Sequence, residues 1–194
     1  MLYFTFVHGL IILLLFLFPF VRRIRRKAGF LSTAGLALFA VYTVLLVKVA
    51  FFPLVWDASF GGTGLPYINL VPLRSILDIV AHTAPATALR QIGGNLLLLA
   101  PLGFLAPVTF PKVRTAGRSC LLLLTAAFGI EAVQLLLSLV TGVPGRVVDI
   151  DDVLLNLAGG LCGYFAYFLL FCRLLPRFLP KVEEKAASPD GGLL

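Results

Sequence analysis

The stretch GRVVDIDDVLLNLAGG at positions 145–160 starts with charged residues and then becomes an apolar run that continues beyond it. Asp149, Asp152 and Asn156 follow one another at three- and four-residue steps, so a helix would carry them on one face. The preceding run GIEAVQ places Glu131 inside a second apolar segment. A charged side chain at the bilayer centre costs about 2.5–3.5 kcal/mol on insertion scales. These polar groups are therefore the first candidates for a functional site.

The composition indicates an integral membrane protein. Of 194 residues, 60% are apolar and only 13% are charged, which is more apolar than one soluble core requires. The formal net charge is +7, yet the Lys and Arg residues form short clusters between apolar runs, without interleaved aromatic residues. This pattern is typical of membrane topology signals, and we expect no nucleic-acid partner.

Five apolar runs are long enough to cross hydrocarbon about 30 Å thick, which takes about 20 helical residues. We place the spans near Leu2–Val21, Phe30–Phe52, Ile92–Phe110, Ser119–Thr141 and Val153–Cys172. The sequence therefore predicts an all-α, polytopic membrane helix bundle. The transmembrane domain would cover residues 1–172, and the polar segment 173–194 would form a disordered cytoplasmic tail.

The basic residues predict the orientation of the bundle. The segments RRIRRK at 22–27 and PKVRTAGR at 111–118 contain no acid, so the positive-inside rule places both in the cytoplasm. Acids accompany the arginines between 57 and 91 and between 142 and 152. We therefore predict a multi-pass plasma-membrane protein with its N-terminus outside and its C-terminus in the cytoplasm.

One sizeable loop lies between the second and third spans. Its middle, LPYINLVPLRSILDIVAHTAP, is too apolar for a solvated loop and too interrupted for a span. We predict a short amphipathic helix near Arg74–His82 that lies on the outer leaflet. The expected fold is thus five transmembrane helices plus one outer interfacial helix.

The depths of the polar residues suggest that they converge. At 1.5 Å per residue, Glu131 lies about 18 Å above Ser119, slightly beyond the bilayer midplane toward the outside. Gln134 is one turn higher on the same face. We expect Asn95 in the first outer turn of the third span. Together with Asp152 and its neighbours, these side chains predict a polar cavity that opens to the outer leaflet.

Each of these residues also has a simpler structural explanation. Asp149 and Asp152 could cap the fifth helix, because acids are favoured at the positive end of the helix dipole. Asn95 could cap the third helix or hydrogen-bond a neighbour. Three glycines have a spacing that lets helices approach closely, and packing is the expected role of Gly159, Gly160 and Gly163. Capping cannot explain Glu131 in mid-span, which favours a functional role for it.

The sequence offers little support for a metal or a cofactor. The three cysteines and two histidines show no metal-ligand spacing. No phosphate-binding loop, dinucleotide-binding motif or serine-hydrolase motif is present. We therefore expect neither a metal site nor a cofactor.

Four motifs follow one another along residues 68–164. They are INLVPLRSI at 68–76, NLLLLAPLGF at 95–104, IEAVQ at 130–134 and the pattern GR..DIDDVLLN..GG..GY at 145–164. In this order they resemble the VanZ-like family of small bacterial membrane proteins. The matching positions are Asn69, Pro72, Asn95, Pro101, Gly103, Glu131, Gln134, Arg146, Asp149, Asp152, Asn156 and Gly159. Leu73 departs from the pattern, since an aromatic residue is expected after the proline.

The resemblance implies a role at the bacterial cell envelope, and the founding member of the family is linked to resistance to the glycopeptide teicoplanin. It supplies no mechanism. We first expect the cavity to bind a membrane lipid or a lipid-linked cell-wall precursor, with Arg74, Arg90 or Arg146 meeting phosphate through charge-assisted hydrogen bonds. The expected ligand-binding residues are Asn69, Arg74, Asn95, Gln134, Arg146, Asp149 and Asn156.

Two other hypotheses stay open at this point. In the first, the protein is an enzyme that acts on the headgroup, with Glu131 and Asp152 as its catalytic carboxylates. In the second, protonation of Glu131 drives a small transporter or flippase. The sequence shows no clear internal repeat, although a homo-oligomer could supply the missing symmetry. A non-catalytic scaffold would require the polar cavity to be dispensable.

Overall fold

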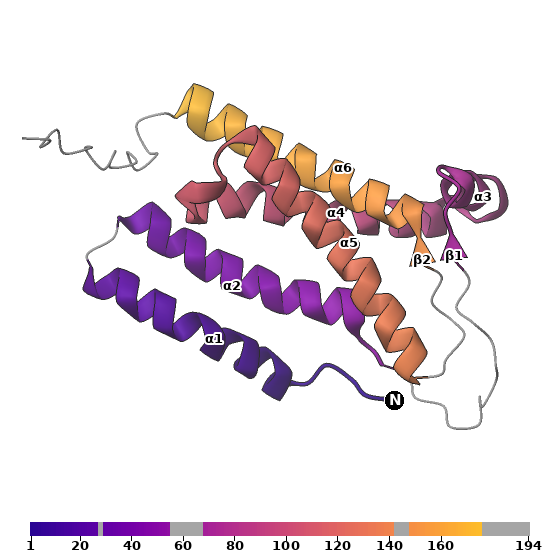
Figure 1. Cartoon of the computed structure of the whole chain (residues 1–194), viewed down its shortest axis with the longest axis horizontal. Helices are drawn as coiled ribbons and strands as arrows, with labels where there is room; N and C mark the ends of the chain where they lie inside the picture. Colours follow the sequence, from indigo (N-terminus) through magenta and orange to yellow (C-terminus); the bar gives the residue numbers. More distant parts are fainter. Residues whose placement is uncertain (27–28, 55–67, 142–147, 176–194) are drawn as a thin grey trace, which may run out of the picture.

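The computed structural model describes residues 1–26, 29–54, 68–141 and 148–175, and most of this part of the chain is helical (Figure 1). Five of the described helices are long and apolar enough to cross a membrane, as the sequence predicts. They are α1 (Phe6–Arg25), α2 (Phe30–Phe51), α4 (Pro85–Thr109), α5 (Ala116–Thr141) and α6 (Ile150–Tyr167), which continues as a π-helix over Phe168–Leu174. The all-α membrane bundle is therefore confirmed.

Short elements connect these helices. The helix α3 (Arg74–His82) is the amphipathic helix predicted between the second and third spans. A short 3-10 helix at Pro111–Val113 separates α4 from α5. The two-residue strands β1 (Ile68–Asn69) and β2 (Val148–Asp149) pair in parallel. They bring together the two segments that lead into α3 and α6.

Several span boundaries differ from the positions predicted from the sequence: α1 begins at Phe6 rather than Leu2, and α5 and α6 each begin three residues before the predicted start. The helix α4 begins at Pro85 rather than Ile92, because proline is favoured at the first helical position and the Ala and Leu residues after it are good helix formers. The helix α1 continues to Arg25 rather than ending at Val21. Arginine is a good helix former, and its charge is favoured near the negative end of the helix dipole. Polar residues at the membrane boundary thus belong to helices rather than to loops.

The helices α4 and α6 run parallel and form the most extensive helix pair of the described chain. Glycines permit their close approach. A Cβ atom added at Gly159 would overlap the carbonyl group of Leu96, and one added at Gly103 would overlap the backbone of Gly160. Small residues at such contacts let helices associate in lipid, where no hydrophobic force drives them together. The interpretation of the α6 glycines as packing residues is confirmed.

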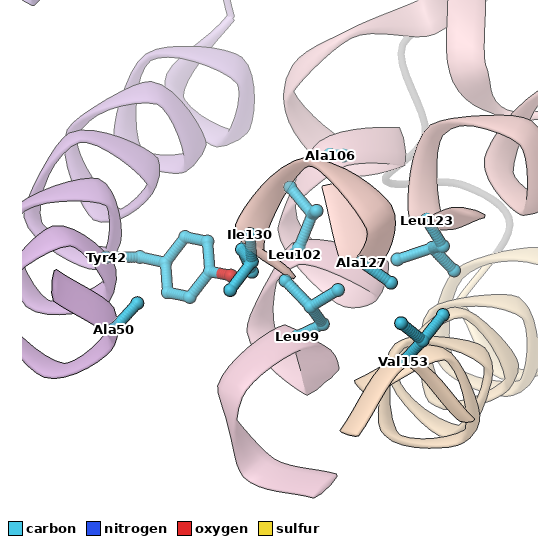
Figure 2. Packing of buried hydrophobic residues seen from close by; sticks show 9 residues of the cluster. All are labelled: Tyr42, Ala50, Leu99, Leu102, Ala106, Leu123, Ala127, Ile130 and Val153. Carbon is cyan, nitrogen blue, oxygen red and sulfur yellow. The ribbon is translucent and has the colours of Figure 1, made fainter. Parts of the chain in front are cut away.

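A buried apolar cluster joins α2, α4, α5 and α6 (Figure 2). Leu99 of α4 and Leu123 of α5 are fully buried in this cluster. Tyr42 extends from α2 toward this cluster, and its hydroxyl group donates a hydrogen bond of 2.9 Å to the carbonyl oxygen of Leu98. Pro101 has no N–H group, so the helix hydrogen bond to the carbonyl of Leu97, the residue before Leu98, is missing. The tyrosine therefore adds a polar contact where the proline weakens the helix.

The bundle has two distinct ends. At one end, which we call the arginine end, Arg23 of α1 donates hydrogen bonds to the carbonyl oxygens of Ser32 and Thr109. At the other end, which we call the strand end, β1, β2 and α3 lie beside the N-termini of α4 and α6 (Figure 1). The C-termini of α2 and α5 meet on this side, where Gln134 Nε2 donates to the Ala50 carbonyl oxygen at 2.9 Å.

The close contact between α4 and α6 predicts unequal effects of alanine at two glycines. Gly159→Ala should lower the thermal unfolding midpoint in detergent, because an added methyl group overlaps the Leu96 carbonyl and overpacking costs about 1–3 kcal/mol. Gly129→Ala on α5 is the matched control, since no atom lies within 4 Å of its Cβ position. Equal midpoints for the two variants would contradict the packing described for α4 and α6.

Candidate functional site

A cavity of about 570 Å³ lies at the strand end among α2, α3, α4, α5 and α6, and we call it the polar cavity. Its polar lining consists of Ser75, Asp78, Arg90, Gln91, Asn95, Gln134, Asp149, Asp151 and Asp152. Its apolar lining includes Val49, Ile79, Ile92, Leu98 and Leu155. Side chains that are far apart in the sequence therefore share one hollow at the end of the membrane helices.

Asp151, near the start of α6, connects this helix to α3 through hydrogen bonds to backbone N–H groups. Its side chain is 1% exposed. One carboxylate oxygen accepts a hydrogen bond of 2.5 Å from the backbone N–H of Leu73. The other accepts from the N–H groups of Ser75 and Ile76 at 2.9 and 3.2 Å. The first N–H groups of a helix have no partner within it and favour negative charge, so Asp151 caps α3 from a different helix.

The same contact explains the backbone of Leu73. This residue has a φ of 66°, in the left-handed region, which costs a non-glycine residue roughly 1–2 kcal/mol. Its N–H bond to the Asp151 carboxylate offsets that cost. The Leu73 side chain is exposed and does not line the polar cavity. The departure from the VanZ-like motif at this position therefore leaves the connection to Asp151 intact, because that connection uses the backbone.

Asn69 and Asp149 join the two short strands. They lie opposite each other in the ladder, and Asn69 Nδ2 donates to Asp149 Oδ1 at 3.0 Å and to Ser75 Oγ at 2.9 Å. The same Asp149 oxygen accepts from the backbone N–H of Asp151 at 2.9 Å. Capping of the fifth span by Asp149, one of the explanations left open, is therefore confirmed. Asp149 is the residue directly before α6, and it lines the polar cavity together with Asp152.

Asp152 and Asn95 form the polar contact between α6 and α4 at the cavity. The Asn95 side-chain amide donates to Asp152 Oδ1, and no hydrogen bond to Asp152 Oδ2 is found within the described part of the chain. Asn95 is not in the first turn of its helix as expected, because α4 begins at Pro85 and has Ala84 as its N-cap. Its capping role is excluded, whereas its hydrogen bond to a neighbour is confirmed.

Two of the sequence candidates are buried away from the polar cavity. Glu131 is 5% exposed and Asn156 is 1% exposed, and neither is among the residues that line the polar cavity. The side-chain oxygen of Asn156 has no hydrogen-bond partner among the described residues. The predicted convergence therefore includes Gln134 with Asn95 and Asp152, but it does not extend to Glu131.

The three arginines proposed as phosphate ligands differ in their position relative to the polar cavity. Arg74 is exposed at the start of α3 and does not line the polar cavity. Arg90, which the sequence offered only as an alternative phosphate ligand, is exposed and does line it. Arg146 lies outside the described residues. Arg90 is thus the arginine that the described cavity offers to an anionic group.

Asp151 is the residue that sequence reasoning missed. Its backbone partners are 75 to 78 positions away in the chain, so no local pattern shows them. One signal was present in the sequence. A helix needs one capping acid, and the DIDD segment has three, so at least one of them required another partner.

The described residues contain no group of three or more His, Cys, Asp or Glu side chains that could hold a metal ion. The three aspartates at the start of α6 are instead engaged by protein N–H groups and by Asn95. What the polar cavity offers chemically is four carboxylates, three side-chain amides, one arginine and one hydroxyl group beside apolar side chains.

The VanZ/LLP1 family model matches residues 39–171, a range that contains every element lining the polar cavity. The chain belongs to the VanZ/LLP1 family. With five helices suited to crossing a membrane, it is a multi-pass membrane protein of that family. Searches of curated proteins and of solved structures find no match. The helix α1 lies outside the part of this VanZ-family protein that the family model matches.

The contacts of Asp151 predict that its loss will free α3. In Asp151→Asn, an amide N–H group faces backbone N–H donors, and hydrogen bonds from backbone to a carboxylate are worth about 1.5–3 kcal/mol. Amide hydrogen exchange over residues 73–82 should therefore accelerate at least tenfold. Asp78→Asn is the control, because it removes the same charge from an exposed site on α3 itself. Equal exchange in the wild type and Asp151→Asn would show that Asp151 does not hold α3.

Proposed function

We propose that this VanZ-family protein binds the headgroup of an amphipathic envelope lipid in the polar cavity, either a phospholipid or a lipid-linked cell-wall precursor. The observation that supports this function most strongly is the place of the cavity. Polar side chains gather at the end of helices suited to crossing a membrane, next to apolar lining residues on the same helices. Ligand sites combine an apolar lining with a few polar groups in this way.

The lining offers partners of both kinds for such a headgroup, with aspartates and amides for its hydroxyl or ammonium groups and one arginine for its phosphate. Arg90 would meet a phosphate through charge-assisted hydrogen bonds. Asp152 has a carboxylate oxygen with no hydrogen bond in the described chain, and it would accept from hydroxyl or ammonium groups. Ile92 and Leu155 would contact the beginning of the acyl or prenyl chain. The lipid would thus place its polar headgroup among the polar side chains and its apolar chain along Ile92 and Leu155.

The geometry favours binding over catalysis. The catalytic hypothesis needs Glu131 and Asp152 to act on the same bond, yet only Asp152 lines the polar cavity. General acid–base catalysis requires a group within hydrogen-bond reach of the proton it transfers. Transport is the second candidate function. Glu131 of α5 is buried in the bundle, and intramembrane acids serve as proton relays in transporters. The family link to teicoplanin fits any function directed at an envelope lipid.

We also propose that the strand end faces the outside of the cell. Exposed basic residues gather at the arginine end, among them Arg22, Arg25, Lys112 and Arg118, and positive loops are retained in the cytoplasm. In this orientation the N-terminus is outside, and the polar cavity meets the outer leaflet of the bacterial plasma membrane.

Thiol labelling in intact cells tests this orientation. In a variant whose three native cysteines are replaced by serine, Asp78→Cys should react with a membrane-impermeant maleimide, because this exposed position lies at the strand end. Lys112→Cys should react only after the cells are opened. The opposite labelling pattern would place the polar cavity on the cytoplasmic side.

Lipids that copurify with the protein test the proposed function. The wild type should retain, above its abundance in the source membrane, a lipid class that depends on the polar cavity, measured by mass spectrometry at matched protein amounts. Asp152→Asn and Arg90→Gln should each reduce this enrichment about tenfold or more, since a charge-assisted hydrogen bond is worth about 1.5–3 kcal/mol. Arg118→Gln, at the other end of the bundle, should leave it unchanged.

The outcomes separate the candidate functions. A lipid profile that is the same in the wild type and in both cavity variants would contradict headgroup binding at this site. A chemically altered lipid that depends on Asp152 would show an enzyme. Lipid movement that requires a proton gradient in reconstituted vesicles and stops in Glu131→Gln would show a transporter.

A further inference from the structure

One face of α1 changes from apolar to basic along its length. The residues on this face are Leu14, Leu17, Phe18, Val21, Arg22 and Arg25, and together with Arg26, the residue that follows the helix, they line a shallow hollow of about 660 Å³. They recur at three- and four-residue steps, so the helix places them in one stripe. We call this surface the arginine stripe.

The arginines of the stripe differ from the fourth arginine of the segment. The guanidinium group of Arg23 donates to two backbone carbonyl oxygens and lies 5.8 Å from the centre of the Phe110 ring. Arg22, Arg25 and Arg26 are exposed, and none of them forms an ion pair within the described part of the chain. Their positive charge is therefore available to a partner outside the chain.

The dimensions of the stripe match one leaflet of a bilayer. From Leu14 to Arg25 the helix rises about 17 Å, and half of a hydrocarbon core measures about 15 Å. Leu14, Leu17 and Phe18 are more than half exposed, and they lie on the bilayer side of the arginines. A partner that fits this surface has an apolar chain about one leaflet long and an anionic group at its end.

A role in topology does not account for this arrangement. The positive-inside rule needs basic residues near the end of a span, whichever side of the helix they face. Here Arg22 and Arg25 continue the same stripe as Phe18 and Val21, while Arg23 is directed into the protein. Basic pockets at membrane helices are suited to anionic lipid headgroups.

We infer that the arginine stripe binds an anionic phospholipid, with the phosphate group held by Arg22, Arg25 and Arg26 and an acyl chain lying along Leu14, Leu17 and Phe18. This site is at the opposite end of the bundle from the polar cavity, and it does not depend on the proposed headgroup-binding function. It lies on α1, outside the part of the chain that the family model matches.

Competition between lipids tests this inference. The purified full-length protein is placed in nanodiscs of phosphatidylcholine containing a minor fraction of phosphatidylglycerol, and the lipids that remain bound are measured by native mass spectrometry. The wild type should retain phosphatidylglycerol at least tenfold over its share in the nanodisc. Arg22→Gln with Arg25→Gln should abolish this preference, and Phe18→Ala should weaken it.

Two matched variants make the result specific. Lys112→Gln with Arg118→Gln removes two exposed charges from the same end of the bundle, and it should keep the preference within about twofold of the wild type. Arg22→Lys with Arg25→Lys keeps both charges on α1, so it should keep most of the preference even if the glutamine variant unfolds.

Three results would overturn the inference. Equal losses in the glutamine variants of α1 and of the control pair would show a general surface-charge effect. Unchanged retention in a folded α1 glutamine variant would show that the arginines hold no lipid. Displacement of the lipid by glycerol phosphate, which has no acyl chain, would show a site for soluble phosphate.

Discussion

The carboxylate of Asp151 accepts three backbone N–H groups at the start of α3, and the form of the polar cavity depends on this contact. The helix α3 is short, amphipathic and packed on few neighbours, so little else in the described chain holds it in place. The cap is supported in turn by Asp149, which accepts the Asp151 N–H, and by Asn69, which joins β1 to β2. One network of buried polar groups thus positions a wall of the cavity.

The close packing of α4 and α6 provides the second constraint. These helices run parallel, so both N-termini lie at the strand end. The helix α5, which follows α4 in the sequence, runs antiparallel to both and brings the chain back to the strand end. Because glycines bring the backbones together, short polar side chains such as Asn95 and Asp152 reach each other across the interface. The polar cavity lies at the strand end of this helix pair, and residues of α3 form part of its lining. Fold and site therefore follow from the same small residues and the same acidic segment.

Much of the fold could be predicted from the sequence, because the length of an apolar run decides whether a helix can cross a membrane. All five spans and the amphipathic α3 are present and overlap the segments predicted from hydropathy and periodicity. The start of α4 was misplaced, since helix propensity continues into the polar residues before Ile92. That error also misplaced Asn95 within its helix, although its contact with the fifth span did not depend on the boundary.

The site was harder to predict than the fold. Depth along each helix correctly brought Gln134, Asn95 and Asp152 to one level, but depth does not show which way a side chain faces. Glu131 is at a similar depth and yet does not line the cavity. Asp151 was missed because its partners are backbone N–H groups in a distant segment. Every residue except proline has such a group, so the residue types do not show which ones bind the carboxylate.

The most direct measurement of headgroup binding is photo-crosslinking at two adjacent positions of α6. Leu155 lines the polar cavity, whereas Leu154 is exposed on another side of the helix. With a photoreactive amino acid at either position, we predict that irradiated cells yield adducts of a single lipid class at 155 and of mixed bulk lipids at 154. The same mixture of adducts at both positions would contradict a binding site for a specific envelope lipid.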